Sequence, residues 1–296
     1  MQKEILLFFL SISSPLLDAV ANIGSFFGEQ SILIILLAWI LYTDDKHKAY
    51  AVSGPILTAS LSMSLIKAIV KAPRPFQVLD EIDGKRLTTA TGYSFPSGHT
   101  TIASSMYFAI ARAYKNKKVT VICTVLVVWV ALSRMYLGVH WPIDVLVGLS
   151  IGLACTLFLY PVFYNISKNP EKKYKVSWIL STVFFACAIP LTVLLQLKMV
   201  DEVAYADFLK TLSIAAGAYF GFARECKKLN YKTDGTVLKK ALRIVLSAAF
   251  SLAIIASLKQ AFGVKQYYTG CLVRYSLVGM FLTYYFPLLF RNLFEN

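Results

Sequence analysis

The fold of this chain is decided by residues 119–163, which read VTVICTVLVVWVALSRMYLGVHWPIDVLVGLSIGLACTLFLYPVF. The runs 119–135 and 142–163 are apolar, and each has the length, about 17–25 residues, that crosses a bilayer core as a helix. Arg134 lies at the end of the first run, His140 lies in the break between the two runs, and Asp144 opens the second run. The stretch therefore predicts two membrane-spanning helices with reactive side chains where they meet.

The rest of the chain has a similar composition. Hydrophobic residues occupy 57% of its 296 positions and the mean hydropathy is +0.61, which soluble domains rarely reach. We therefore expect an all-α, polytopic integral membrane bundle with about nine transmembrane helices. The expected spans are residues 30–43, 51–70, 98–113, 119–135, 142–163, 176–197, 207–223, 241–259 and 270–290.

The N-terminal region and the C-terminal half need separate assignments. Residues 4–27 are apolar but interrupted by Pro15, Asp18 and glycines, which favours a helix lying in the membrane interface over one that crosses. We assign residues 1–165 to a catalytic helical core that includes this interfacial helix. Residues 166–296 contain no motif that we can name, and we assign them to an accessory four-helix transmembrane extension of the same bundle.

The positive charge of the chain predicts its orientation. The formal net charge is +14, but Lys and Arg gather in short breaks near 44–50, 112–118, 165–175 and 224–240. That distribution is typical of cytoplasmic loops of membrane proteins and argues against a nucleic-acid partner. It predicts an N-terminus outside, a C-terminus inside, and all three polar motifs described below on the non-cytoplasmic face.

The first motif contains two cations. Lys67 and Arg74 are seven residues apart, close to two helical turns, so both can be presented on one side near the end of a helix that Pro73 and Pro75 terminate. An arginine fork and a lysine ammonium both bind phosphate oxygens. The alternative is that these side chains only extend towards lipid headgroups.

The second motif, Pro96-Ser97-Gly98-His99, opens the span that begins at residue 98. Serine is a good helix N-cap, and glycine allows a ligand to approach the backbone closely. A helix N-terminus binds anions through its unpaired amides. We expect Ser97 and Gly98 to form an anion site with His99 just inside it. The alternative is a capping turn with an incidental histidine.

The third motif is the most specific. His140 precedes Trp141-Pro142, and Asp144 lies in the first turn of the following helix. A separation of four residues allows Asp144 to accept a hydrogen bond from one imidazole nitrogen, which leaves the other as a nucleophile. Arg134 can reach the same phosphate from the preceding helix. The alternative is that Asp144 only caps its own helix.

No cluster of His, Asp or Glu has the spacing of a divalent-metal site, and the five cysteines are widely separated. The negative charge of a bound phosphate would therefore be neutralised by Lys67, Arg74 and Arg134, and we expect a reaction that needs no metal or other cofactor.

At these residues the chain resembles the type 2 phosphatidic acid phosphatase superfamily. That pattern is Lys, six residues, Arg-Pro; then Pro-Ser-Gly-His; then Ser-Arg, five residues, His, three residues, Asp, and this chain matches every position between 67 and 144. The resemblance implies that His140 attacks phosphorus to form a phosphohistidine while Asp144 holds its imidazole. It also implies that His99 protonates the leaving oxygen and then acts on water, and that Lys67, Arg74, Arg134 and the amides around Ser97 and Gly98 bind the phosphate.

The resemblance leaves the substrate open. Our first hypothesis is a membrane phosphatase that hydrolyses a lipid phosphate or diphosphate, such as phosphatidate, phosphatidylglycerol phosphate or a polyprenyl diphosphate. A small-molecule phosphatase similar to glucose-6-phosphatase is the alternative. That family also has nine spans, an N-terminus outside and a C-terminus inside, as we expect for this chain. A phosphotransferase and a non-catalytic transporter are further alternatives. The segment 76–91, which joins the first two motifs, is the candidate specificity element.

Overall fold

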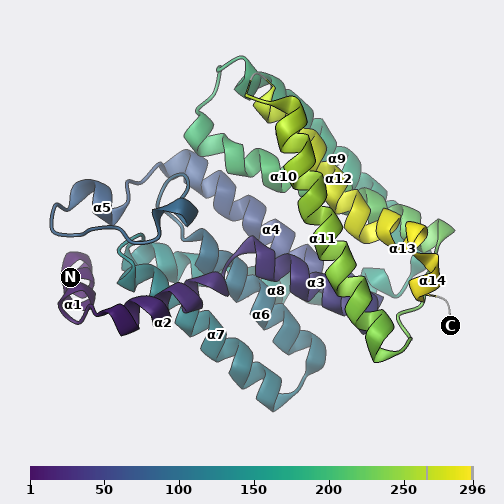
Figure 1. Cartoon of the computed structure of the whole chain (residues 1–296), viewed down its shortest axis with the longest axis horizontal. Helices are drawn as coiled ribbons and strands as arrows, with labels where there is room; N and C mark the ends of the chain where they lie inside the picture. Colours follow the sequence, from purple (N-terminus) through teal and green to yellow (C-terminus); the bar gives the residue numbers. More distant parts are fainter. Residues whose placement is uncertain (265, 295–296) are drawn as a thin grey trace. The chain divides into compact units, whose positions relative to one another are not determined.

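The computed structural model describes residues 1–264 and 266–294, and within those ranges it is all-helical, with no strand. Figure 1 shows the elements, which are α1 (Gln2–Ser11), α2 (Pro15–Phe26), α3 (Gln30–Thr43), α4 (Lys46–Val70), α5 (Pro75–Val78), η1 (Leu87–Thr89), α6 (Gly98–Tyr114), α7 (Lys117–Tyr136), α8 (Pro142–Ser167), α9 (Pro170–Gln196), α10 (Glu202–Lys228), α11 (Val237–Phe262), α12 (Tyr267–Met280), η2 (Phe281–Tyr285), α13 (Phe286–Leu289) and α14 (Arg291–Phe294). The all-α prediction is confirmed for these residues.

Fewer helices than expected have the length and hydropathy of a membrane span. Six do so: Lys46–Val78, Lys117–Tyr136, Pro142–Ser167, Pro170–Gln196, Val237–Phe262 and Tyr267–Leu289. A seventh is possible if Pro15–Phe26 and Ser31–Thr43, which meet at 46°, form one broken span. The expected count of about nine is thus not confirmed. The difference lies in α3, α6 and α10. The helices α3 and α6 are short, with 14 and 17 residues, and α10 contains polar residues that lower its hydropathy.

The described chain divides into two compact units. The first contains Met1–Leu33 and Gly54–Tyr160, and the second contains Ile34–Ser53 and Pro161–Asn296. This division differs from a single boundary at residue 165, because the end of α3 and the start of α4 belong with the C-terminal helices. A hydrophobic pattern along the chain does not reveal which distant helices pack on one another.

Small residues bring helices of the first unit close together. Figure 1 shows α6 and α7 as neighbours joined by a short turn. On α8, a Cβ at Gly152 would lie 2.6 Å from the carbonyl oxygen of Thr101 on α6. On α2, a Cβ at Gly24 would lie 2.2 Å from Oγ of Ser133 on α7. These contacts position the start of α6 and the end of α7, where the polar motifs lie.

The N-terminal region forms two helices rather than one. Ser14 interrupts the segment as the N-cap of α2, where its hydroxyl accepts from the Leu17 amide at 3.3 Å, and Pro15 occupies the first helical position. Serine followed by proline is a strong helix start. The helix α2 then packs along α7, so this region contributes directly to the first unit.

In the second unit, α10 closely approaches α12 and the following η2. A Cβ at Gly217 would lie 2.0 Å from the carbonyl oxygen of Ser276, and one at Gly221 would lie 1.8 Å from Oγ1 of Thr283. Glycines four residues apart form the small-residue face that allows membrane helices to pack backbone to backbone.

The second unit contains two buried charged side chains, Glu225 and Arg243, whose partners lie in the same unit. Glu225, 2% exposed, accepts from Lys46 at 2.8 Å and from Lys173 at 3.0 Å. Arg243 is fully buried, and its guanidinium donates to the carbonyl oxygens of Tyr42, Thr233, Asp234 and Leu293 at 2.5–2.9 Å. Because all these donors are satisfied, we interpret both groups as structural.

We predict that Gly217→Leu destabilises the second unit by about 3 kcal/mol or more, because the new side chain would collide with backbone rather than with a movable side chain. Thermal unfolding in detergent measures this effect. Ala253→Leu, at an exposed position of α11, adds the same side chain without a neighbouring backbone and is the matched control. Equal unfolding midpoints for the two variants would contradict the proposed packing.

Candidate active site

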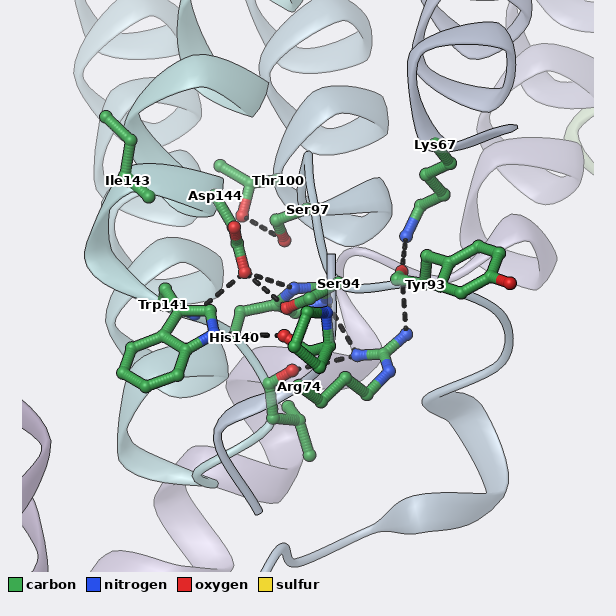
Figure 2. Close-up of polar contacts among 12 residues, drawn as sticks. Lys67, Arg74, Tyr93, Ser94, Ser97, Thr100, His140, Trp141, Ile143 and Asp144 are labelled. Atoms are coloured by element: carbon green, nitrogen blue, oxygen red, sulfur yellow. Dashed lines mark hydrogen bonds and ion pairs between the residues drawn. The ribbon is translucent and has the colours of Figure 1, made fainter. Parts of the chain in front are cut away.

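The carboxylate of Asp144 joins the segments that carry the motifs. Its Oδ2 accepts from the Trp141 amide at 2.8 Å, from the hydroxyl of Ser94, and from Nδ1 of His140 at 3.3 Å (Figure 2). By accepting the hydrogen bond from the Trp141 amide, Asp144 caps the first turn of α8, as a side chain at the third helical position can do. Asp144 therefore caps its helix and orients His140 at the same time, so the two roles considered from sequence are compatible.

His140 is held in one orientation. It is 1% exposed, and because a carboxylate can only accept, the contact with Asp144 places the proton on Nδ1. Its Nε2 lies 3.3 Å from Nη1 of Arg74. Burial lowers the pKa of His140, and the neighbouring Arg74 and Lys67 lower this pKa further. The imidazole is consequently neutral at neutral pH, with a lone pair on Nε2, as a nucleophile requires.

The cations of the first motif lie on one side of this histidine. Lys67 donates to the carbonyl oxygen of Tyr93 (Figure 2). Arg74 donates to the carbonyl oxygens of Thr91 at 2.7 Å and Val139 at 2.8 Å. Arg74 is 2% exposed. Both side chains therefore point to the segment before Pro96 instead of towards lipid headgroups, and Arg74 also contacts His140.

The second motif begins α6, and one detail differs from the sequence expectation. The Ser97 amide donates to the carbonyl oxygen of Asp144 at 2.9 Å, and the Ser97 hydroxyl pairs with that of Thr100 at 2.9 Å. The Ser97 amide is thus occupied and does not bind the phosphate in this arrangement. A Cβ at Gly98 would meet only the end of Met63, at 3.4 Å. Packing within the chain therefore does not require glycine at this position, which favours close approach of a ligand as the reason.

Several buried nitrogens near these residues have no hydrogen-bond partner within the described residues. Arg134 is fully buried, and its Nη1 donates to Ser25 at 2.6 Å, while Nε and Nη2 have no hydrogen-bond partner. Nε2 of His99 and Nε of Arg86 are also buried without one. Leaving a buried donor unsatisfied costs about 1–3 kcal/mol. Several such atoms close to other cations are the signature of a site built for an anion.

The structure brings the predicted residues together. Direct contacts link Ser97, His140 and Asp144 with Arg74, and Lys67 shares the Tyr93 oxygen with Arg74. The Arg134 carbonyl oxygen accepts from the amide of Val139, the residue before His140, at 3.4 Å. His99 is the second residue of α6, directly after Ser97 and Gly98. No group of three or more His, Cys, Asp or Glu that could hold a metal ion occurs in the part of the chain that the structure describes.

Sequence reasoning missed several residues that complete the site. Ser94 bonds to Asp144, Ser25 bonds to Arg134, and Glu29 pairs with Arg86. Gly24 and Gly28 are four residues apart, a spacing that could have signalled a close helix contact, but the sequence analysis treated these glycines only as interruptions of an apolar segment.

Two family models match separate parts of this chain. The family model of the PAP2 superfamily matches residues 49–168, and that of the PAP2 superfamily phosphatase transmembrane extension matches residues 209–295. The lipid A 4'-phosphatase of Porphyromonas gingivalis is 30% identical over 173 residues, which are 55% of this chain and 72% of that protein. The decaprenylphosphoryl-5-phosphoribose phosphatase of Mycobacterium tuberculosis is 32% identical over 151 residues, 48% of this chain and 81% of that protein. The crystal structure of Aquifex aeolicus LpxE has a similar fold, with a TM-score of 0.50 and 24% identity over 54% of this chain and 94% of that one.

We predict that inorganic phosphate stabilises this protein, by about 2.7 kcal/mol at a concentration 100 times its dissociation constant. Arg134→Gln should weaken phosphate binding by roughly tenfold or more, because charge-assisted hydrogen bonds are lost. Thermal unfolding against phosphate concentration measures both. Arg112→Gln is the matched control, since Arg112 is an exposed arginine at the other end of α6. An equal shift for both variants would contradict an anion site at Arg134.

Proposed function

Because this chain belongs to the PAP2 superfamily, we propose that it is a metal-independent phosphatase that hydrolyses a lipid phosphate or diphosphate through a phosphohistidine. One observation carries the proposal. A neutral imidazole, oriented by Asp144, contacts Arg74, and the buried Arg134 has two donors without a partner among the described residues. A nucleophile beside an anion site is what phosphoryl transfer needs, since that reaction depends mostly on positioning and charge stabilisation.

In the first step, Nε2 of His140 attacks phosphorus and the bond to the leaving oxygen breaks. The imidazolium that forms keeps its Nδ1 proton on Asp144. Arg134 presents Nε and Nη2 to two phosphoryl oxygens as a bidentate fork, and Lys67 and Arg74 supply further positive charge. His99 gives a proton from Nε2 to the leaving oxygen. A bound phosphate brings negative charge beside this imidazole, which favours its protonated form.

In the second step, His99 takes a proton from water, and the resulting oxygen nucleophile attacks the phosphohistidine. The phosphorus–nitrogen bond breaks, inorganic phosphate leaves, and His140 returns to its neutral form. The second step thus restores His99 to the protonated state that the first step consumed.

A lipid substrate is favoured over a soluble one. The chain is a multi-pass membrane protein, and the two curated relatives above are named as phosphatases of lipid A and of a decaprenyl-linked sugar phosphate. The motifs lie at helix ends, where a headgroup can enter while its tail stays in the bilayer. No specific observation favours a small soluble ester.

The proposed site faces the non-cytoplasmic side, with the N-terminus outside and the C-terminus inside. Support comes from the basic breaks between helices, which alternate with less basic ones. About nine crossings require α3, α6 and α10 to span as well, with α6 and α10 as interior helices. Eleven residues of α6 and thirteen of α10 are buried, so neighbouring helices shield their polar groups from lipid.

We predict that His140→Ala abolishes both phosphate release from a lipid phosphate in detergent and the acid-labile phosphoenzyme. Because uncatalysed monoester hydrolysis is extremely slow, with known accelerations up to about 10²¹, loss of the nucleophile should leave no measurable turnover. Activity should persist in EDTA. His47→Ala is the control, since the His47 ring contacts the Ser167 carbonyl oxygen at 2.8 Å in the second unit and has no place in the proposed site. A phosphoenzyme in His140→Ala, or strict dependence on Mg²⁺, would refute the mechanism.

A further inference from the structure

Arg86 is a further cation at this site that the family motifs do not contain. It lies in the segment between the first two motifs, with φ 56° and ψ 47°, immediately before η1. Its Nη2 is paired with Glu29, and its Nη1 donates to the carbonyl oxygen of Asn22 at 3.1 Å and to Oδ1 of Asn22 at 3.3 Å. The left-handed backbone conformation is costly for arginine, by roughly 1–2 kcal/mol. The side chain is therefore held in place by a specific set of contacts.

Two of the three guanidinium nitrogens of Arg86 have partners. Glu29 and Asn22 occupy the two terminal nitrogens, while Nε is buried without a partner among the described residues. The side chain as a whole is 22% exposed, so a ligand can reach it. A buried donor without a partner is a position that an anion can fill.

Arg86 is on the side of the site where His99 lies. A Cβ at Gly28 would lie 3.0 Å from Cβ of His99, so the residue next to Glu29 packs directly on this histidine. On the other flank, the Thr89 hydroxyl accepts from Nη1 of Arg134 at 3.5 Å and donates to the Arg86 carbonyl oxygen at 3.3 Å. Arg86 is thus connected to His99 through one neighbour and to Arg134 through another.

We propose that Arg86, held by Glu29, forms a second anion subsite on the leaving-group side, and that the preferred substrate is a lipid diphosphate. The proposal rests on the proposed function, because His99 marks the leaving-group side only if it is the proton donor. An alkoxide that takes a proton from His99 leaves as a neutral alcohol and needs no further cation. A leaving phosphate keeps its negative charge, which a fixed guanidinium stabilises.

The reaction then has a defined course. Nε2 of His140 attacks the terminal phosphorus of the lipid diphosphate, and the bond from that phosphorus to the bridging oxygen breaks. The electron pair stays on the bridging oxygen, which becomes part of a lipid monophosphate bound to Arg86 and protonated by His99. Water then attacks the phosphohistidine, so that one lipid diphosphate and one water yield one lipid monophosphate and one inorganic phosphate.

A binding experiment tests the subsite without requiring turnover. Inorganic diphosphate and inorganic phosphate are titrated against thermal unfolding of the purified protein in detergent. We expect the wild-type protein to bind diphosphate more tightly, and Arg86→Gln to reduce this preference by roughly 10- to 100-fold. Lys85→Gln is the matched control, since Lys85 is the neighbouring cation but bonds to Asp18 and Ser13 at 2.6 Å. It should keep the wild-type preference.

Arg86→Lys covers the case in which Arg86→Gln does not fold. Lysine keeps the charge opposite Glu29 but lacks Nε, so this variant should also lose preference for diphosphate. An undiminished preference in the folded Arg86 variants, or a wild-type protein that binds phosphate as tightly as diphosphate, would overturn the proposal.

Hydrolysis of a prenyl diphosphate and of the matching prenyl monophosphate separates this proposal from the proposed function. The ratio of kcat/KM for the diphosphate to that for the monophosphate should fall in Arg86→Gln and stay constant in Lys85→Gln. If the wild-type protein binds diphosphate through Arg86 but hydrolyses neither lipid, the phosphatase function fails and the anion subsite stands. If it hydrolyses both lipids and Arg86→Gln leaves the ratio unchanged, the subsite fails and the phosphatase function stands.

Discussion

The site depends on one carboxylate. Asp144 accepts from Ser94, His140 and Trp141 through its side chain, and its backbone carbonyl accepts from Ser97. One residue at the start of α8 thus fixes the loop before Pro96, the start of α6 and the proposed nucleophile. Because it is 1% exposed, water cannot replace these donors, and losing one of them would leave buried polar groups unsatisfied. The same contacts that fold this end of the first unit therefore also prepare its chemistry.

The positive charges are arranged around this carboxylate with little negative charge to offset them. Arg74 is satisfied by carbonyl oxygens, whereas Arg134 has two buried donors without described partners. Burying such charge is costly unless it is paired, and Glu29 balances only Arg86 directly. The uncompensated positive charge of the cluster therefore favours the binding of an anion. A phosphate would accept hydrogen bonds from the donors that have no described partner. In the proposed diphosphate subsite, Arg86 would bind a second phosphate on the leaving-group side.

Sequence spacing predicted the proposed reactive residues, but it did not predict the residues that hold them in place. The separation of four residues between His140 and Asp144 predicted their contact, and the seven residues from Lys67 to Arg74 predicted a shared side. Both are local relations, one across the break between α4 and α5 and one across the start of α8. Ser25, Ser94 and Arg86 reach the site through tertiary packing, which no periodicity encodes. The span count differed because α3 and α6 are short and α10 contains polar residues. The assignment of residues 34–53 to the second unit was likewise invisible in composition.

The central claim is that Nε2 of His140 and the cations around it grip a single phosphoryl group. A crystal structure with vanadate, which mimics pentacoordinate phosphorus, tests it most directly. The account predicts vanadium bonded to Nε2 of His140, with equatorial oxygens accepting from Nε and Nη2 of Arg134 and with His99 on the opposite side. Vanadium bonded to any other residue, or bound away from Arg134, would contradict it.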